Sequence, residues 1–230
     1  MKLKIIALAL AAGIAASALA QTNIYNNPNN HKYLGLRLSY ELACPGDVNL
    51  GDGYKVDAYG NSSGFSAGVV YHLPVMYNFY FEPGAMLAYN TYSINKGVVG
   101  EFLPDGLATI AKDASVRMWK LRLPLQCGYH FDIMPDLSVS VFTGPEIIVG
   151  LKGKNHVTVD NDSDYAVSSG CYGGDGQLNR FDLGWRFGAQ GTYYEHYTLS
   201  FSGVVGLCDQ MRKSPKMHTN VFDITLGYNF

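Results

Sequence analysis

The sequence predicts an all-β fold: an eight-stranded antiparallel up-and-down transmembrane β-barrel with short periplasmic turns and long extracellular loops. Three observations predict it. Eight runs of residues alternate apolar and polar side chains, which is the period of a strand with two unlike faces. The chain opens with the features of an export leader, and it closes inside a strand on the aromatic Phe230. A closed barrel gives such a terminal strand a partner, because the last strand pairs with the first.

The N-terminal segment 1–20 has the features of a secretory signal peptide. Lys2 and Lys4 precede an apolar stretch, and small residues end it before the expected cleavage. We expect a flexible periplasmic segment at 21–31 and the barrel domain at 32–230. Elsewhere Gly, Pro and charged residues interrupt every apolar run before it reaches the roughly 18 residues of a membrane helix. A membrane-spanning mature chain must therefore cross as a barrel, since lipid cannot satisfy free backbone groups.

Composition agrees with one β-domain and excludes some partners. The 230 residues include 26 Gly, 17 Tyr and 11 Phe, with 16% charged residues. This is a strand-and-turn composition rich in interfacial aromatics. The formal net charge is −2, and loss of Lys2 and Lys4 with the leader makes it −4. A nucleic-acid partner therefore has no electrostatic support.

The first four strands are expected between about residues 34 and 131. Each has one apolar face, whose members are spaced two residues apart. The faces are Leu34, Leu36, Leu38, Tyr40 and Leu42; then Phe65, Ala67, Val69 and Tyr71; then Phe79, Phe81, Pro83, Ala85, Leu87 and Tyr89; then Trp119, Leu121, Leu123, Leu125, Cys127, Tyr129 and Phe131. The opposite faces carry Gly, Ser and charged residues, so each strand separates an apolar from a polar environment.

The last four strands follow the same pattern up to the C-terminus. Their apolar faces are Leu137, Val139, Val141, Ile147 and Val149; then Phe181, Leu183, Trp185, Phe187 and Tyr193; then Tyr197, Leu199, Phe201, Val205 and Leu207; then Phe222, Ile224, Leu226, Tyr228 and Phe230.

The connections alternate in length, and this predicts the orientation. Short segments join alternate strand pairs near Leu73 to Asn78, Asp132 to Asp136 and Tyr194 to His196. Long segments join the other pairs near Cys44 to Ser62, Ser93 to Ala114, Lys152 to Leu178 and Cys208 to His218. Short periplasmic turns and long extracellular loops are the outer-membrane arrangement.

Aromatic residues gather at the end of the barrel with the short turns. We expect them to form one membrane-interface girdle, as aromatic belts do at lipid headgroups. Its members are Tyr71, Phe79, Phe81, Tyr129, Phe131, Tyr193, Tyr197, Tyr228 and Phe230.

The polar faces carry charges of both signs, and the predicted barrel encloses them. Charges withdrawn from water are retained when they are paired and hydrogen-bonded. We therefore predict an interior charge network and not a catalytic cluster, made of Arg37, Glu41, Glu82, Lys120, Arg122, Glu146, Asp182, Arg186 and Asp223. The lumen of an eight-stranded barrel is just wide enough for side chains to fill. Free diffusion of solutes is not expected.

Prolines and cysteines leave questions of local structure. Pro83, Pro124 and Pro145 fall inside strand runs and remove ladder hydrogen bonds, so we expect bulges there. Cys127 lies on an apolar face and is interpreted as a buried hydrophobe. Export permits disulfides. Pairing among the other three cysteines stays open: Cys44, Cys171 and Cys208.

Short motifs recur in the strands that descend to the short turns. They include Val70-Tyr71-His72, Gly128-Tyr129-His130, Phe181-Asp182-Leu183-Gly184 and the terminal Gly227-Tyr228-Asn229-Phe230. Over about residues 32–230 the chain resembles the Gram-negative outer-membrane β-barrel family that includes PorT-like and porin-like proteins. The resemblance implies insertion by the barrel-assembly machinery, which reads the aromatic-ended last strand. Some PorT-like members take part in protein secretion, so the resemblance implies that role as one candidate.

The histidines invite an enzymatic interpretation that the sequence does not favour. His72, His130 and His196 each adjoin a tyrosine, and we expect polar anchors at headgroup level. A lipid-modifying enzyme would need a nucleophile and a histidine near the outer rim. Ser200 and Ser202 face inward without a sequence-local histidine, and the loops offer His156 and His218.

Residues Asp160 to Asp164 resemble the start of a calcium loop, but the rest of the pattern fails. Tyr165 stands in place of the glycine, and Cys171 in place of the bidentate glutamate. A solvated loop is the preferred interpretation. We expect no cofactor, metal site or catalytic residue.

The predicted function is that of a small, non-enzymatic integral outer-membrane protein with a structural or surface-binding role through its extracellular loops. Its expected partners are outer-membrane lipid, the barrel-assembly machinery during insertion, and a protein outside the cell or in the periplasm. Two alternatives stay open. One is a secreted lipocalin-like barrel with its apolar face inward around an apolar ligand, and the other is an outer-membrane lipid-modifying enzyme.

Overall fold

The computed structural model describes residues 31–46, 48–51, 54–56, 59–94, 111–159, 170–172, 178–210 and 217–230. The expected signal peptide, 1–20, and nearly all of the expected periplasmic segment, 21–31, lie outside these residues. Within them there is no helix long and apolar enough to cross a membrane.

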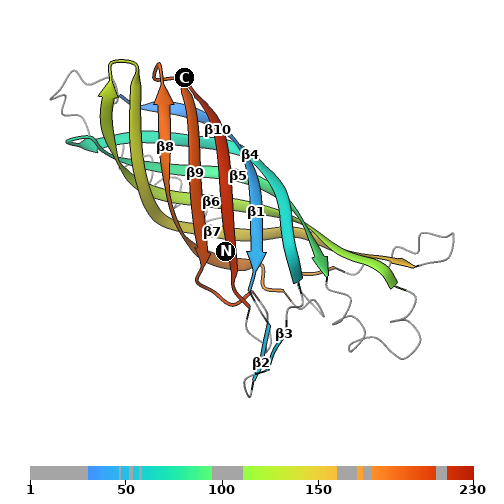
Figure 1. Ribbon diagram of the computed structural model, residues 1–230. Coiled ribbons are helices and arrows are strands. Elements are labelled where there is room, and N and C mark those ends of the chain that lie inside the picture. Colours follow the sequence, from blue (N-terminus) through green and yellow to red (C-terminus); the bar gives the residue numbers. More distant parts are fainter. Residues whose placement is uncertain are drawn as a thin grey trace, which may run out of the picture.

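Eight strands form one closed antiparallel barrel (Figure 1). The barrel strands are β1 (Tyr33–Pro45), β4 (Tyr59–Met76), β5 (Phe79–Ile94), β6 (Ala111–Met134), β7 (Leu137–Val159), β8 (Phe181–Tyr193), β9 (Tyr197–Gly206) and β10 (Thr219–Asn229). Neighbours in the barrel follow the chain, and β10 pairs with β1 to close it. The predicted fold class is confirmed.

The closing seam explains why the chain can end in a strand. Strand β10 pairs with β1 from Pro45↔Thr219 to Gly35↔Asn229. The amide of Phe230 then donates to the carbonyl of Leu34 at 2.9 Å. The final backbone groups therefore have partners, and no free edge remains at this seam.

The apolar faces point outward and the charged faces point inward. Leu38, Phe65 and Leu226 are 57%, 61% and 59% exposed, whereas Arg122 is 2% exposed and Glu146 is fully buried. This is inverted relative to a water-soluble barrel, whose apolar side chains fill the interior. The lipocalin-like alternative is therefore wrong.

Two of the short connections are tight turns with left-handed backbone. Tyr77 and Asn78 have φ of 50° and 66°, and Tyr194 and Glu195 have φ of 47° and 61°. Two successive positive φ values match the twist of the flanking strands in a two-residue hairpin. The β6–β7 turn closes the same end of the barrel, where Met134 pairs with Leu137.

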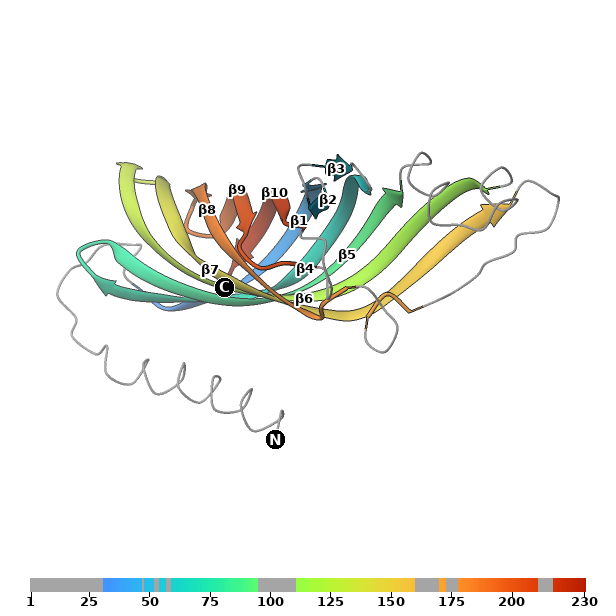
Figure 2. The ribbon, with the colours of Figure 1, turned by 90° about the horizontal axis from the view of Figure 1, so that it is seen from below.

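Strands β6 and β7 are much longer than their neighbours. They span 24 and 23 residues, and they stay paired as far as Ala111↔Val159. Figure 2 shows the two strands continuing past the rest of the barrel. We call the extension, residues 111–118 and 153–159, the β6–β7 ribbon. It lies at the extracellular end, opposite the short turns.

The first long connection contains a small sheet that the sequence analysis did not predict. Strands β2 (Val48–Gly51) and β3 (Tyr54–Val56) pair antiparallel outside the barrel. Val48 and Val56 pair at its base. Four and three residues are short for strands, and the alternation over so short a run is too weak to detect from sequence.

The three strand prolines do not form the expected bulges. The register between β5 and β6 is the same at Pro83↔Leu125 and Met86↔Arg122, and that between β6 and β7 is the same at Pro124↔Glu146 and Cys127↔Thr143. Pro145 pairs with Trp185 within an unbroken ladder. The missing donors are absorbed as gaps in the β5–β6 and β6–β7 ladders, because an omitted hydrogen bond does not require an extra residue. Bulges occur elsewhere, for instance between Trp119 and Lys120.

Candidate functional site

The centre of the barrel holds a network of two guanidinium groups and three carboxylates from five strands. Arg122 on β6 donates from Nε to Glu146 Oε1 at 2.5 Å, and from Nη2 to Asp223 Oδ2 at 3.0 Å. Its Nη1 donates to Glu41 and, at 3.1 Å, to Asp223 Oδ1. All four residues are buried, so these ion pairs are formed without screening by bulk water.

Arg186 on β8 joins the same carboxylates from the other side. Its Nε donates to Glu146 Oε2 at 2.5 Å, and its Nη2 donates to Asp223 Oδ2 at 2.6 Å. Its Nη1 donates to the hydroxyl of Ser202 at 2.9 Å. Glu146 is thus bound by one arginine through each oxygen. The five charged groups sum to −1, and the Asn90 amide donates to Glu41 at 2.9 Å.

A second polar cluster lies nearer the periplasmic end. Glu82 accepts from Gln126 Nε2 at 2.8 Å and contacts His72 Nδ1 at 3.3 Å. Arg37 Nη2 lies 3.7 Å from Glu82, and Arg37 Nη1 donates to Asn229 Oδ1 at 2.9 Å. The cluster therefore ties β1 to β5 and to the last residues of β10.

Stacked rings fill the lumen beside this cluster. The ring of His72 stacks on Tyr33 at 4.3 Å and lies 4.6 Å from Tyr80, which stacks on His130 at 4.4 Å. Gly128 leaves space for the Tyr80 ring, because any side chain at position 128 would collide with that ring. We call these four residues, Tyr33, His72, Tyr80 and His130, the ring column. Together with the Glu82 cluster it fills the periplasmic end of the lumen.

The expected headgroup-level anchors are wrong for two of the three histidines. His72 and His130 are 0% and 2% exposed and point into the lumen. The alternation could have predicted the inward position of both histidines. Tyr71 and Tyr129 point outward, so the residues that follow them must point inward. His196 does lie at the turn end, where its Nδ1 is 2.8 Å from the carbonyl oxygen of Asn229.

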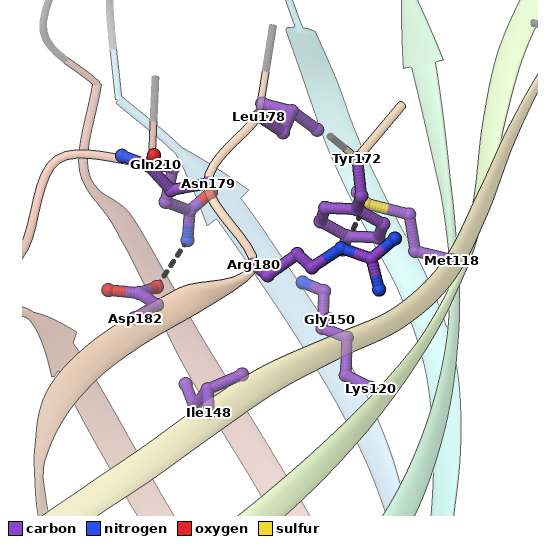
Figure 3. A pocket seen from close by; sticks show the side chains of 10 residues that line it. All are labelled: Met118, Lys120, Ile148, Gly150, Tyr172, Leu178, Asn179, Arg180, Asp182 and Gln210. Carbon is purple, nitrogen blue, oxygen red and sulfur yellow. Dashed lines mark hydrogen bonds between the residues drawn. The ribbon is translucent and has the colours of Figure 1, made fainter. Parts of the chain in front are cut away.

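Lys120 and Asp182 belong to the predicted charge network, but they lie outside the central network and the Glu82 cluster, near the extracellular mouth. Lys120 donates to the Tyr92 hydroxyl at 2.6 Å, and Asp182 accepts from Gln210 at 2.7 Å. Both line a cavity of about 20 Å³, which is room for about one water molecule. In Figure 3, Arg180 lies beside Tyr172 at the rim of this cavity, and Asp182 turns toward Gln210.

The extracellular mouth is closed by an apolar cluster that the sequence analysis missed. Barrel side chains turned into the lumen meet side chains from the β7–β8 and β9–β10 connections. The members of this mouth cluster are Ala43, Tyr92, Val116, Met118, Cys171, Leu178, Val204, Met217 and Val221. Backbone hydrogen bonds hold the loop residues in place. The amide of Leu178 donates to the carbonyl of Cys171 at 3.2 Å, and the amide of Gly46 donates to the carbonyl of His218 at 2.8 Å.

The predicted girdle residues lie on the outer face at the short-turn end. Tyr197 and Phe230 are 60% and 66% exposed, and Tyr228 packs edge-on against both at 5.5 and 5.1 Å. Tyr71, Phe79, Phe131 and Tyr193 are also exposed, while Phe81 and Tyr129 are half-buried. The C-terminal face of Phe222, Ile224, Leu226, Tyr228 and Phe230 is exposed along its whole length.

All four cysteines carry thiols and not disulfides. Cys127 is exposed on the outer face, so its interpretation as a buried hydrophobe is wrong: lipid, not protein, surrounds an apolar side chain there. Cys171 is buried in the mouth cluster, and burial raises the pKa of its thiol.

Little in the described structure suggests catalysis or metal binding. Ser200 and Ser202 are buried, and Ser202 lies against Asp223 and Arg186 and not against a histidine. His218 contacts Asp209 at 3.4 Å in the β9–β10 connection, at the extracellular rim. Among the described residues no group of three His, Cys, Asp or Glu could hold a metal ion. The calcium-loop candidate, Asp160 to Asp164, lies outside them.

The fold and the enclosed charges agree with a known family of membrane proteins. The family model for the outer membrane protein beta-barrel domain matches residues 6–211. The chain belongs to this family. It is an outer-membrane protein, as predicted. The finer PorT-like resemblance stays a prediction.

Among solved structures, Ail, the attachment invasion locus protein of Yersinia pestis, in complex with the heparin analogue sucrose octasulfate, aligns with a TM-score of 0.44 at 13% identity. The alignment covers 87% of this chain and 99% of Ail. Neisserial surface protein A aligns at 0.42 and 10% identity, over 86% and 97% of the two chains. OprG from Pseudomonas aeruginosa aligns at 0.41 and 13%, over 88% and 98%. No curated protein matches the sequence.

Proposed function

We propose that the protein is a non-enzymatic outer-membrane barrel that is closed to solutes and presents its extracellular end to a partner. The packed lumen is the observation that carries the proposal. The Glu82 cluster, the central network and the mouth cluster follow one another from the periplasmic to the extracellular end. A lumen filled in this way leaves the ends of the barrel as the surfaces that reach water.

The extracellular end has the larger surface for binding. The β6–β7 ribbon extends past the neighbouring strands, and the β2–β3 sheet adds to the same end. Binding residues concentrate on loops that a rigid scaffold positions. The barrel therefore serves as the scaffold, and the ribbon with the adjoining loops serves as the contact surface for a protein outside the cell.

The test is a chain that lacks residues 111–116 and 155–159 of the ribbon, with short loops that join β5 to Arg117 and Lys154 to β8, expressed beside the wild type. Photo-crosslinking in intact cells, from a position at the base of the ribbon that both chains retain, is expected to give a defined adduct that the shortened chain loses while its barrel still folds. An adduct that persists would contradict the proposal. Lipid composition that changes on deletion of the gene would instead favour the lipid-modifying alternative. The secretion role implied by the PorT-like resemblance stays a prediction, which secretion assays in the same deletion strain address.

A further inference from the structure

Three cations gather on the outer face where β6 and β7 leave the barrel. Arg117 pairs directly with Lys154 across the two strands, and Trp119 pairs with Lys152 two residues further into the barrel. All four side chains are exposed, and directly paired residues of antiparallel strands share a face. We call Arg117, Lys152 and Lys154 the outer cation cluster.

This cluster is electrostatically unfavourable in isolation. Like charges directly opposite on antiparallel strands destabilise the pairing. No carboxylate of the part of the chain whose side chains are described forms an ion pair with Arg117, Lys152 or Lys154. The contrast with the lumen is informative, since Arg122 there pairs with three carboxylates and Arg186 with two. Among the described side chains, the outer cation cluster thus has no protein anion to pair with.

The depth of the cluster in the membrane indicates which anion is available. Trp119 lies ten residues above the girdle residue Tyr129 on the same face of β6. Ten strand residues span about 34 Å, and a tilt of about 40° reduces this to about 26 Å, close to the roughly 25 Å apolar band of such barrels. Trp119 packs against Tyr89 at 5.0 Å, as expected of an outer interfacial pair. The three cations therefore lie just above the hydrocarbon, at headgroup depth.

We propose that the outer cation cluster binds the phosphate groups of a phosphorylated lipid in the outer leaflet. Arginine offers a planar pair of donors to phosphate oxygens, and the two lysines add mobile point charges on long stems. A phosphate between Arg117 and Lys154 cancels their repulsion, while the acyl chains lie along the exposed apolar face below Trp119. The bound lipid would hold the base of the ribbon at the membrane surface. This site is separate from the protein contact proposed for the ribbon.

The test uses the full-length protein in detergent and a diphosphorylated glycolipid, with the same glycolipid lacking phosphate for comparison. Native mass spectrometry counts bound lipid, and fluorescence of Trp119 in a Trp185→Phe background reports its position. Wild type is expected to prefer the phosphorylated lipid, with affinity that falls as salt rises. The variant R117Q/K152Q/K154Q is expected to lose about a hundredfold in affinity, and K152Q or K154Q alone about fivefold.

Arg180→Gln is the matched control. Arg180 is an exposed cation at the same end of the barrel, but its guanidinium lies 6.0 Å from the centre of the Tyr172 ring and not in the cluster. Its removal is expected to leave lipid affinity unchanged. Heat-dependent gel mobility verifies that each variant is folded, and the single variants carry the test if the triple variant does not fold.

Two results would overturn the proposal. One is equal binding of the phosphorylated lipid by wild type and the folded lysine variants. The other is complete displacement of the lipid by inorganic phosphate in molar excess, because it would show an ion site with no contribution from the acyl chains. Retention of the lipid against inorganic phosphate supports a lipid site.

Discussion

Arg122 and Asp223 form a two-pronged ion pair across the lumen, with Nη1 to Oδ1 at 3.1 Å and Nη2 to Oδ2 at 3.0 Å. Strands β6 and β10, which carry them, are four places apart in the order of the barrel, so the pair joins opposite walls. A one-residue slip of either strand would turn its charge toward lipid. The pair therefore favours one register as well as closing the lumen.

Removal of a single charge from this network is expected to be costly. Glu146→Gln removes one of the two carboxylates that Arg122 and Arg186 share, and the loss of one partner of a buried ion pair costs about 3 kcal/mol or more. Urea unfolding of the barrel in lipid vesicles measures this change in free energy. Glu195→Gln is the control, since Glu195 is exposed at a turn and its contact with His31 is 3.7 Å long. Equal stability of the two variants would contradict the prediction.

The ring column is expected to contribute to stability through packing. His72→Ala removes the ring between Tyr33 and Tyr80 together with a partner of Glu82. Truncation of a large buried ring costs about 3 kcal/mol. In the same unfolding measurement, His196→Ala is expected to have a much smaller effect, because that side chain is exposed. An effect of similar size at both positions would argue against a packed periplasmic end.

The native cysteines can report whether their positions face lipid or the closed mouth, so no new labelling site has to be introduced. In single-cysteine variants, Cys127 on the outer face is expected to react faster with a lipid-soluble maleimide than with a charged, water-soluble one. Cys171 is expected to react slowly with either reagent at neutral pH. Thiolate is the reactive form, and burial raises the pKa of this thiol, so its labelling should keep rising above the pH at which an ordinary cysteine levels off. Rapid labelling of Cys171 at neutral pH would show that the mouth cluster is open.

A closed lumen predicts the absence of a channel. Wild-type protein in a planar bilayer is expected to give no discrete conductance steps, since the mouth cluster and the central network block the lumen in series. Insertion is verified separately by protease protection of the barrel. Regular steps of one size from inserted wild type would contradict this prediction and favour a porin-like role.

The period-two alternation predicted most of this fold because a transmembrane barrel enforces it physically. Each strand residue faces either lipid or the lumen, so Leu121 and Arg122 must differ in polarity. The lengths of the connections then ordered the strands. The same pattern placed Arg37, Glu41 and Arg186 inside without any information on their partners.

The contacts themselves could not be predicted from alternation. Which carboxylate meets Arg122 depends on the tilt and register of strands that are distant in sequence. The mouth cluster was missed because Val116 and Met118 are apolar residues on a face expected to be polar, and their partners Leu178 and Met217 lie in loops without periodicity. The prolines kept the register because the ladder tolerates an omitted hydrogen bond.

Collision accessibility of nitroxide labels tests most directly that lipid surrounds the apolar face and that the charges are enclosed. Labels are placed one at a time at Leu121, Leu123 and Ile224 on the outer face, and at Ser200 and Thr225 in the lumen, after the native cysteines are replaced by serine. In lipid vesicles the first three are expected to be accessible to oxygen, which concentrates in lipid, and inaccessible to a water-soluble nickel complex. The lumen positions are expected to be shielded from oxygen. High oxygen accessibility at Ser200 and Thr225, with shielding of the leucines, would contradict this arrangement.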